Sequence, residues 1–148
     1  MVSIQEVTAY LHEEIPVTRA MGIEVTAWDG RSVTLAAPLA PNQNHADTAF
    51  GGSIASLGIL AGYCLLYLVF RERKLSTRVL IQKSATEYLR PIDELMTATA
   101  SCPEPAALEE FLETMRRKRR ARMEIESKIL CRKMLAATST GLFVAMVY

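Results

Sequence analysis

The chain has 148 residues, half of them hydrophobic, and a formal net charge of +1 at pH 7. This length predicts one domain with a sizeable core, and a charge near zero predicts neither a nucleic-acid nor a membrane partner. Three widely spaced cysteines show neither a disulfide framework nor metal-ligand spacing, which favours a reducing cytoplasm. No cofactor is predicted. Residues 1–6 lack the basic segment and apolar run of a signal peptide, so we expect none.

The N-terminal segment predicts a helix that ends before Pro16. Ser3 can act as its N-cap, and Glu6 completes a capping box three residues later. Apolar residues then recur at helical spacing: Ile4, Val7, Leu11 and Ile15. We interpret His12 as a solvated residue of this helix.

Two alternating stretches follow, over residues 22–28 and 32–39. Apolar residues at every second position predict two strands. The Asp29–Gly30 pair between them predicts a hairpin turn.

The most informative stretch is residues 42–70. Its first part is polar and irregular, and Gly51 and Gly52 then lead into an apolar run that ends at Phe70. We interpret it as a loop that precedes the N-terminus of a long buried helix. Backbone N–H groups at such a terminus are unpaired, and the helix dipole favours a developing negative charge there. The two glycines allow a ligand to approach the backbone closely.

The same stretch could also be a membrane span. Residues 48–70 are 23 uncharged residues, which is long enough to cross a bilayer, and Gly58 and Gly62 have a spacing typical of helix packing. Its first residues are small and polar, however, and strand-like sequence flanks it on both sides. A central helix wrapped by a sheet would be equally apolar. We therefore favour a buried helix.

The second half of the chain predicts four strands and a short helix. A charged cluster at residues 71–74 ends the long helix. The strands are expected over residues 79–89, 95–102, 120–129 and 134–147, and the helix contains Leu108, Phe111, Leu112 and Met115. Because most strands alternate, we expect an antiparallel sheet covered on one face by the long helix, an α+β architecture.

This order of elements, with Gly-Gly at the start of the central helix, resembles the hotdog fold, an antiparallel sheet wrapped around a long helix. Residues 38–44 (PLAPNQN) and 48–53 (TAFGGS) resemble the thioesterase domain that in other proteins is fused behind an acetyltransferase. Residues 88–91 (YLRP) and the basic run at 117–122 resemble strand ends of acyl-CoA thioesterases. The resemblance covers nearly the whole chain. It implies one hotdog domain, 1–148, in a homodimer or dimer of dimers with active sites at the protomer boundary.

Two positions depart from the pattern of several branches of that family. Those branches have an Asn at the distance of Asn44 from the two glycines, as here, but a His where this chain has Phe50. They also have an acidic residue seven positions after the second glycine, where this chain has Ile59. The usual carboxylate is therefore missing, and another residue must activate water.

Thioester hydrolysis requires stabilisation of the carbonyl oxygen and an activated water or nucleophile. The backbone amide of Gly52, with that of Gly51, is the candidate for the oxygen. Asp47 or His45 could act as general base, and Asn44 could orient the water or the carbonyl.

Each candidate has a structural alternative. Asp47 or Thr48 would suit the cap of the long helix, Asn44 could form the loop, and His45 could be solvated. Phe50 is expected in the core or in the wall of a substrate pocket. Because these residues share one loop that leads into Gly-Gly, we favour a functional site.

The basic run at residues 116–122 has two interpretations. Arg119, Arg120 and Arg122 could bind the phosphates of coenzyme A or an acidic carrier protein, because guanidinium groups fit phosphate geometry. The run could equally be a solvated helix end and an exposed strand face. Cys64 is a poor nucleophile candidate, because it lies inside the apolar helix.

The sequence therefore predicts an acyl thioesterase that hydrolyses acyl-CoA or acyl-carrier-protein thioesters. One alternative is a hotdog dehydratase or hydratase, in which His45 and Asp47 would act at the helix start. Another is a non-catalytic module that binds acyl thioesters, which Ile59 favours.

Overall fold

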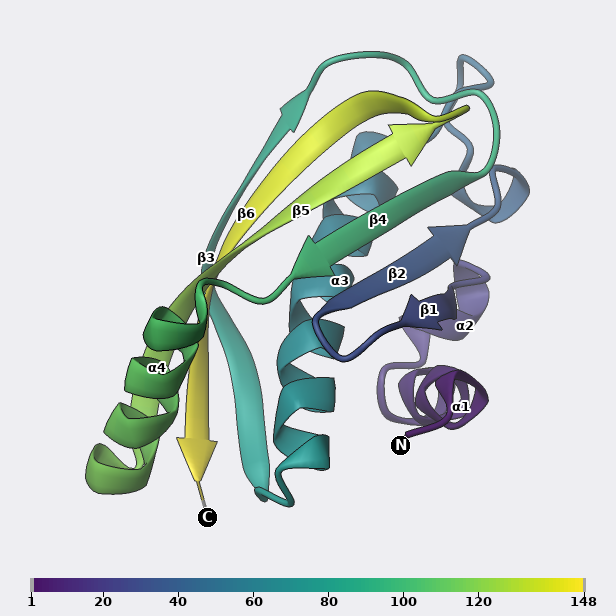
Figure 1. Cartoon of the computed structure of the whole chain (residues 1–148). Helices are drawn as coiled ribbons and strands as arrows, with labels where there is room; N and C mark the ends of the chain where they lie inside the picture. Colours follow the sequence, from purple (N-terminus) through teal and green to yellow (C-terminus); the bar gives the residue numbers. More distant parts are fainter. Residues whose placement is uncertain (1, 148) are drawn as a thin grey trace.

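The computed structural model describes residues 2–147 and shows a curved antiparallel sheet wrapped around one long helix, α3 (Figure 1). The helices are α1 (Ile4–Glu14), α2 (Val17–Ala20), α3 (Gly51–Glu72) and α4 (Pro105–Lys118), with a 3-10 turn at Ala40–Asn42. The strands are β1 (Glu24–Trp28), β2 (Ser32–Ala37), β3 (Thr77–Tyr88), β4 (Met96–Ser101), β5 (Arg120–Cys131) and β6 (Met134–Val147). Each predicted element is present within a few residues of its expected bounds, whereas α2 was not predicted.

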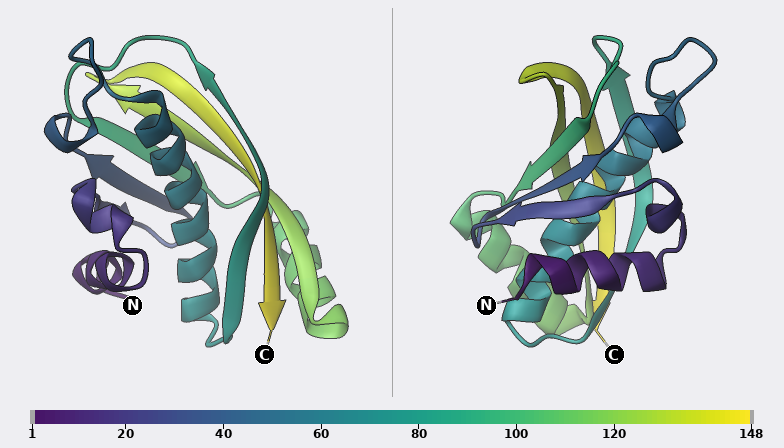
Figure 2. Two further views of the ribbon diagram at one scale, coloured as in Figure 1. Left: turned by 180° about the vertical axis from the view of Figure 1, so that it is seen from behind. Right: turned by 90° about the vertical axis from the view of Figure 1, so that its right-hand side faces the viewer.

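The six strands lie in the order β1-β2-β4-β5-β6-β3, and every neighbouring pair is antiparallel. The predicted α+β architecture is confirmed. The sheet therefore has two edges, β1 and β3, and α3 packs on its concave face between them (Figure 2).

Helix α3 is long and apolar enough to cross a membrane, but 72% of its most apolar window is buried inside the fold. Its sheet-facing side includes Leu57, Leu65 and Leu68, all fully buried. Gly58 and Gly62 contact the sheet so closely that neither position has room for a side chain. A Cβ on Gly58 would lie 2.6 Å from the Ser139 side chain, and a Cβ on Gly62 would lie 2.7 Å from the Phe143 ring. The spacing that suggested membrane packing therefore lets β6 approach the helix.

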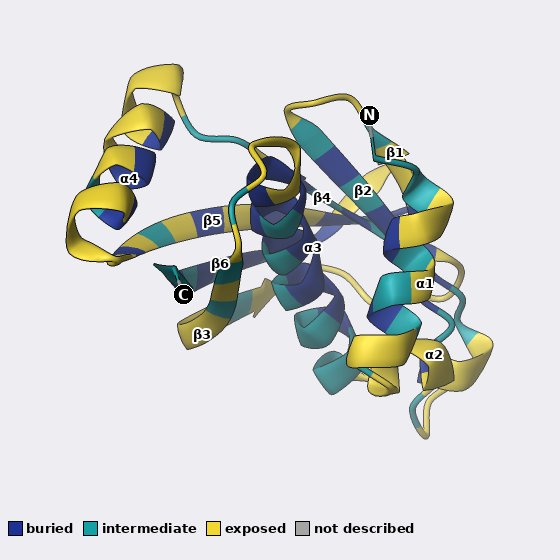
Figure 3. Ribbon diagram, turned by 90° about the horizontal axis from the view of Figure 1, so that it is seen from below, coloured by how far each residue is buried: buried dark blue, intermediate teal, exposed yellow. Residues whose placement is uncertain are grey.

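Helices α1 and α4 lie on opposite sides of α3 (Figure 3). In α1, Ser3 is the N-cap and its hydroxyl accepts from the amide of Glu6, as predicted. In α4, the four predicted apolar residues are buried, and Phe111 stacks on Phe70 at the end of α3. The prediction for His12 was wrong: its imidazole Nε2 lies 2.7 Å from the carbonyl oxygen of Ile23, so the ring binds the chain just before β1.

Candidate functional site

Asn42 fixes the start of the loop that leads into α3. Its side chain is 2% exposed, and its amide Nδ2 donates to the carbonyl oxygens of Met21 and Pro38, both at 2.8 Å. Its own carbonyl accepts from the amide of Phe50 at 2.7 Å. The two ends of the loop are thereby tied together and to the segment that precedes β1.

Asn44 closes the middle of the same loop. Its Oδ1 accepts from the amides of Ala46 at 2.8 Å and Thr48 at 3.1 Å, and its Nδ2 donates to the Thr48 hydroxyl at 2.9 Å. These bonds support the loop-forming alternative, because the side chain is already engaged on both of its polar atoms. Any part in substrate binding would come through the loop shape that it holds.

His45 and Asp47 lie on the exposed side of the loop. Asp47 has a positive φ of 62° and accepts from the Gln43 side chain at 2.8 Å. The expectation that Asp47 or Thr48 caps α3 was wrong. The N-cap is Phe50, with no side-chain hydrogen bond, because the helix begins only at Gly51.

The first two amides of α3 are available to a ligand. The next two, of Ser53 and Ile54, both donate to the carbonyl of Phe50. Within residues 2–147, the amides of Gly51 and Gly52 have no hydrogen-bond partner in the fold. Two adjacent N–H groups at the positive end of a 22-residue helix form a site suited to a developing oxyanion.

A cavity of about 360 Å³ opens beside this helix start. Its lining consists of Thr48, Ala49, Gly51, Ile54, Tyr88, Leu89, Arg90, Pro91 and Ile92. Tyr88 donates its hydroxyl to the carbonyl of Gly51 at 3.0 Å. Tyr88 and Arg90 were not among the predicted site residues; the similarity of residues 88–91 to acyl-CoA thioesterases was the signal that could have placed them in the site.

Of the predicted site residues of the loop and helix start, only Gly51 lines this cavity; Asn44, His45, Asp47, Phe50 and Gly52 do not. Phe50 is 57% exposed, and its ring covers Gly52 so closely that a Cβ on Gly52 would collide with it. The aromatic ring therefore covers one side of the helix start, and its exposure shows that Phe50 is not in the core.

The predicted basic residues form a separate feature at the junction of α4 and β5. A hollow of about 270 Å³ is lined by Lys118, Arg120 and Arg122 together with Thr114 and Ala121. Arg119 does not line it and instead ends α4 with a φ of 66°. In the described part of the chain, no carboxylate lies within ion-pair distance of these four cations.

The basic hollow and the helix start lie at opposite ends of the sheet. Strand register aligns Arg120 with Met146 and Arg78, whereas Tyr88 aligns with Ala137. Ten residues of strand separate the two ends, a distance of roughly 30 Å. One protomer therefore does not bring its own Gly51 and Arg120 together.

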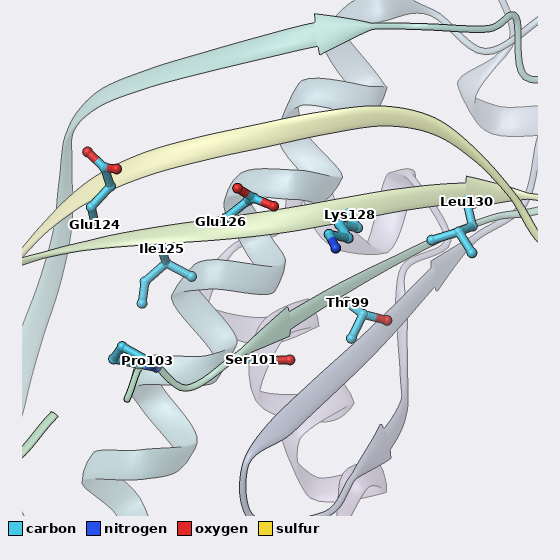
Figure 4. A pocket seen from close by; sticks show the side chains of 8 residues that line it. All are labelled: Thr99, Ser101, Pro103, Glu124, Ile125, Glu126, Lys128 and Leu130. Atoms are coloured by element: carbon cyan, nitrogen blue, oxygen red, sulfur yellow. The ribbon is translucent and has the colours of Figure 1, made fainter. Parts of the chain in front are cut away.

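A further hollow of about 450 Å³ lies on the outer face of β4 and β5 (Figure 4). Glu124, Glu126 and Lys128 follow one another along β5, and Thr99 and Ser101 of β4 lie across from them (Figure 4). The hollow contains no helix terminus, and its carboxylates would repel an oxyanion. No group of side chains in the described chain has the arrangement of a metal site.

The cysteines offer no alternative nucleophile. Cys64 is fully buried in α3, and this burial raises the pKa of its thiol. Partial burial also raises the pKa of Cys102. Both thiols are therefore held in the unreactive protonated form at neutral pH.

Comparison with known proteins agrees with this geometry. Residues 4–147 match the profile of the family described as "Putative thioesterase (yiiD_Cterm)". The chain belongs to this family. The match covers almost the entire chain and so includes the loop, the helix start and the basic run.

Solved structures share the same hotdog fold. A "putative thioesterase" from Shewanella oneidensis is 25% identical with a TM-score of 0.88, over 97% of this chain and 96% of that one. A protein of unknown function from Chlorobaculum tepidum is 24% identical with a TM-score of 0.92, over 97% and 94%. A thioesterase from Haemophilus influenzae is 14% identical with a TM-score of 0.77, over 99% and 92%. These similarities establish the fold.

Proposed function

We propose that the protein hydrolyses the thioester bond of an acyl-CoA or an acyl-carrier-protein substrate. The observation that carries this proposal is the pair of unpaired amides at Gly51 and Gly52 beside the 360 Å³ cavity. They suit the carbonyl oxygen of a thioester, which gains negative charge when water attacks the carbonyl carbon. Collapse of that intermediate breaks the C–S bond and releases a carboxylic acid and a free thiol.

The general base is proposed to come from the loop that Asn44 holds together. Asp47 and His45 are both exposed, and neither is buried against a partner that would keep it from water. Asp47 stays the first candidate because it is closest in sequence to the two glycines. Its hydrogen bond from Gln43 leaves the second carboxylate oxygen available to accept a proton.

We also propose a homodimer formed by the outer edges of two β3 strands. Antiparallel pairing about a two-fold axis would bring the N-terminal end of the partner's β3 next to Tyr88. Arg122 is linked to that edge, because its Nε donates to Gln82 of β3 at 2.9 Å. Pairing would therefore move the partner's basic hollow toward the helix start, where it could bind the phosphates of coenzyme A.

One observation favours the non-catalytic alternative. Ile59 lies on the half-buried side of α3, so an apolar side chain stands where related enzymes have an acid. A protein with an oxyanion site and no base would bind acyl thioesters without turnover. The dehydratase or hydratase alternative would again depend on His45 and Asp47.

Release of free thiol from a panel of acyl-CoA thioesters tests the proposal. Hydrolysis produces one thiol for each substrate consumed, hydration of an unsaturated acyl group produces none, and a binding module shows saturable binding without turnover. Absence of thiol release across the panel and across acyl-carrier-protein thioesters would overturn the proposed activity.

Variants of the loop then assign the base. Asp47→Asn should lower kcat by about 10²- to 10⁴-fold if Asp47 is the base. Since Asp47 does not cap α3, this change should leave the thermal stability nearly unchanged. His45→Ala is the matched variant: if it alone abolishes turnover, His45 is the base.

A further inference from the structure

Tyr88 makes an unusual contact for an exposed strand residue. Its side chain is 54% exposed, yet its hydroxyl reaches back to the sheet's concave side and donates to the carbonyl of Gly51 at 3.0 Å. Its ring lies against the same glycine, because a Cβ built on Gly51 would be 3.5 Å from the Tyr88 hydroxyl oxygen. The last residue of β3 thus touches the first residue of α3.

The Tyr88 backbone is held firmly on the sheet. Tyr88 is paired with Ala137 of β6, and the next two amides, of Leu89 and Arg90, both donate to the carbonyl of Ala136 at 2.8 and 3.1 Å. The ring and hydroxyl therefore connect a fixed strand end to the helix start. By contrast, no side chain caps α3.

The chemical consequence follows from the peptide unit that Tyr88 contacts. The carbonyl of Gly51 and the N–H of Gly52 belong to one planar peptide group. A hydrogen bond to that carbonyl fixes the direction of the N–H and polarises it, because hydrogen bonds in a chain strengthen one another. The N–H in question is one of the two unpaired donors at the helix start.

We propose that Tyr88 is a positioning residue for the oxyanion-binding amide of Gly52, an inference that rests on the proposed thioester hydrolysis. Tyr88 acts through the Gly51–Gly52 peptide and contacts no reacting atom in this role. Its contribution is to hold the donor in place before the oxyanion forms, which lowers the barrier without strengthening ground-state binding.

The test is Tyr88→Phe, which removes one oxygen and keeps the ring beside Gly51. Steady-state kinetics with a substrate hydrolysed by the wild type should show kcat lowered by about 3- to 10-fold, the effect of one hydrogen bond, with KM unchanged. The matched control is Tyr10→Phe, which removes a hydroxyl bonded to Tyr63 at 2.8 Å, away from the helix start. The control should keep the wild-type kcat.

A second measurement does not depend on activity. In ¹H–¹⁵N NMR spectra, Tyr88→Phe should shift the amide resonance of Gly52, since its peptide carbonyl loses a hydrogen bond. The amide resonances of Gly58 and Gly62, deep in α3, should not shift, which would show that the fold is intact. An unmoved Gly52 resonance, or a kcat equal to that of the wild type, would overturn the inference.

Failure of the proposed role of Tyr88 can be distinguished from failure of the proposed hydrolase activity. If the wild type releases thiol and Tyr88→Phe does so equally fast, the role of Tyr88 is wrong and the hydrolase proposal stands. If the wild type releases no thiol from any substrate, both proposals fail, whatever the NMR spectra show.

Discussion

The two edge strands of the sheet, β1 and β3, differ in how far the rest of the chain covers them. An edge strand presents backbone groups that lack a neighbouring strand. At the β1 edge, the amide of Ile23 donates to the backbone carbonyl of Thr18 at 3.0 Å, and that of Val25 donates to the Thr8 hydroxyl at 2.9 Å. His12 binds the Ile23 carbonyl. Residues of α1 and α2 therefore cover the start of this edge.

The β3 edge is different in length, exposure and covering. β3 has 12 residues, against five in β1, and β6 lies on one side of it, whereas residues 2–147 place no strand on the other side. Two of its apolar side chains are exposed, Leu80 at 56% and Ile81 at 39%. The comparison teaches that the chain covers the start of one edge with residues of α1 and α2 and leaves the other edge, the one that we propose for the dimer, exposed.

The largest expected effect comes from proline in β3. Ala85 and Thr86 are consecutive in the ladder with β6, so one of their amides faces β6 and the other faces the free edge. Proline removes the amide at each position. The variant that loses the outward amide should raise the dimer dissociation constant by about 100-fold or more while staying folded. Sedimentation velocity at micromolar concentration measures this.

The other proline variant is the internal control for that experiment. It should lower the melting temperature strongly, because it removes a hydrogen bond to β6. A wild-type protein that is already monomeric at micromolar concentration would contradict the proposed β3 interface, and so would two proline variants that both remain dimers.

At the β1 edge, Thr8→Val should lower the free energy of unfolding by about 1–2 kcal/mol, because it leaves the amide of Val25 without its partner. Urea denaturation followed by circular dichroism gives the value. Thr26→Val is the control, since its hydroxyl only donates to an exposed carbonyl of Thr34 at 3.3 Å. Equal losses in both variants would mean that Thr8 does not protect this edge.

A smaller effect is expected where the basic hollow meets β3. Arg120→Gln combined with Arg122→Gln should raise KM for CoA thioesters by about 3- to 10-fold at low salt, and less at high salt because screening weakens the contact. A pantetheine thioester, which lacks the nucleotide phosphates, should be unaffected. Arg116→Gln is the control, because Arg116 pairs with Glu113 at 3.9 Å and lies outside the hollow.

The smallest effect concerns the hairpin that holds β1. The amides of Arg31 and Ser32 donate to Asp29 and lower the pKa of its carboxyl. The ionised Asp29 carboxylate therefore contributes fully to the free energy of unfolding above its unfolded-state pKa, which is near 3.8. This contribution is lost as the pH falls through the lower folded-state pKa. In acid denaturation curves, Asp29→Asn should remove this part of the pH dependence of the free energy of unfolding, and it should leave the proposed β3 interface unchanged.

Much of the fold was predictable because local signals agreed. The Ser3 cap, the Asp29 turn and the apolar spacing in α4 each act over a few residues, and the structure confirms all three. Hydrophobic alternation predicted most of the strands, and β3 and β4 were expected from their composition and flanking residues. His12 escaped prediction because its partner, Ile23, lies eleven residues away beyond an unpredicted short helix.

By itself, the sequence determined the family, the antiparallel sheet and the Gly51–Gly52 start of a buried helix, because periodicity and glycine placement are properties of neighbouring residues. Only the tertiary structure decided what surrounds that start. It placed Tyr88 on the Gly51 carbonyl, turned Asn44 inward to hold the loop and separated the basic run from the cavity. These relations depend on strand register between distant segments, which no local pattern in the chain encodes.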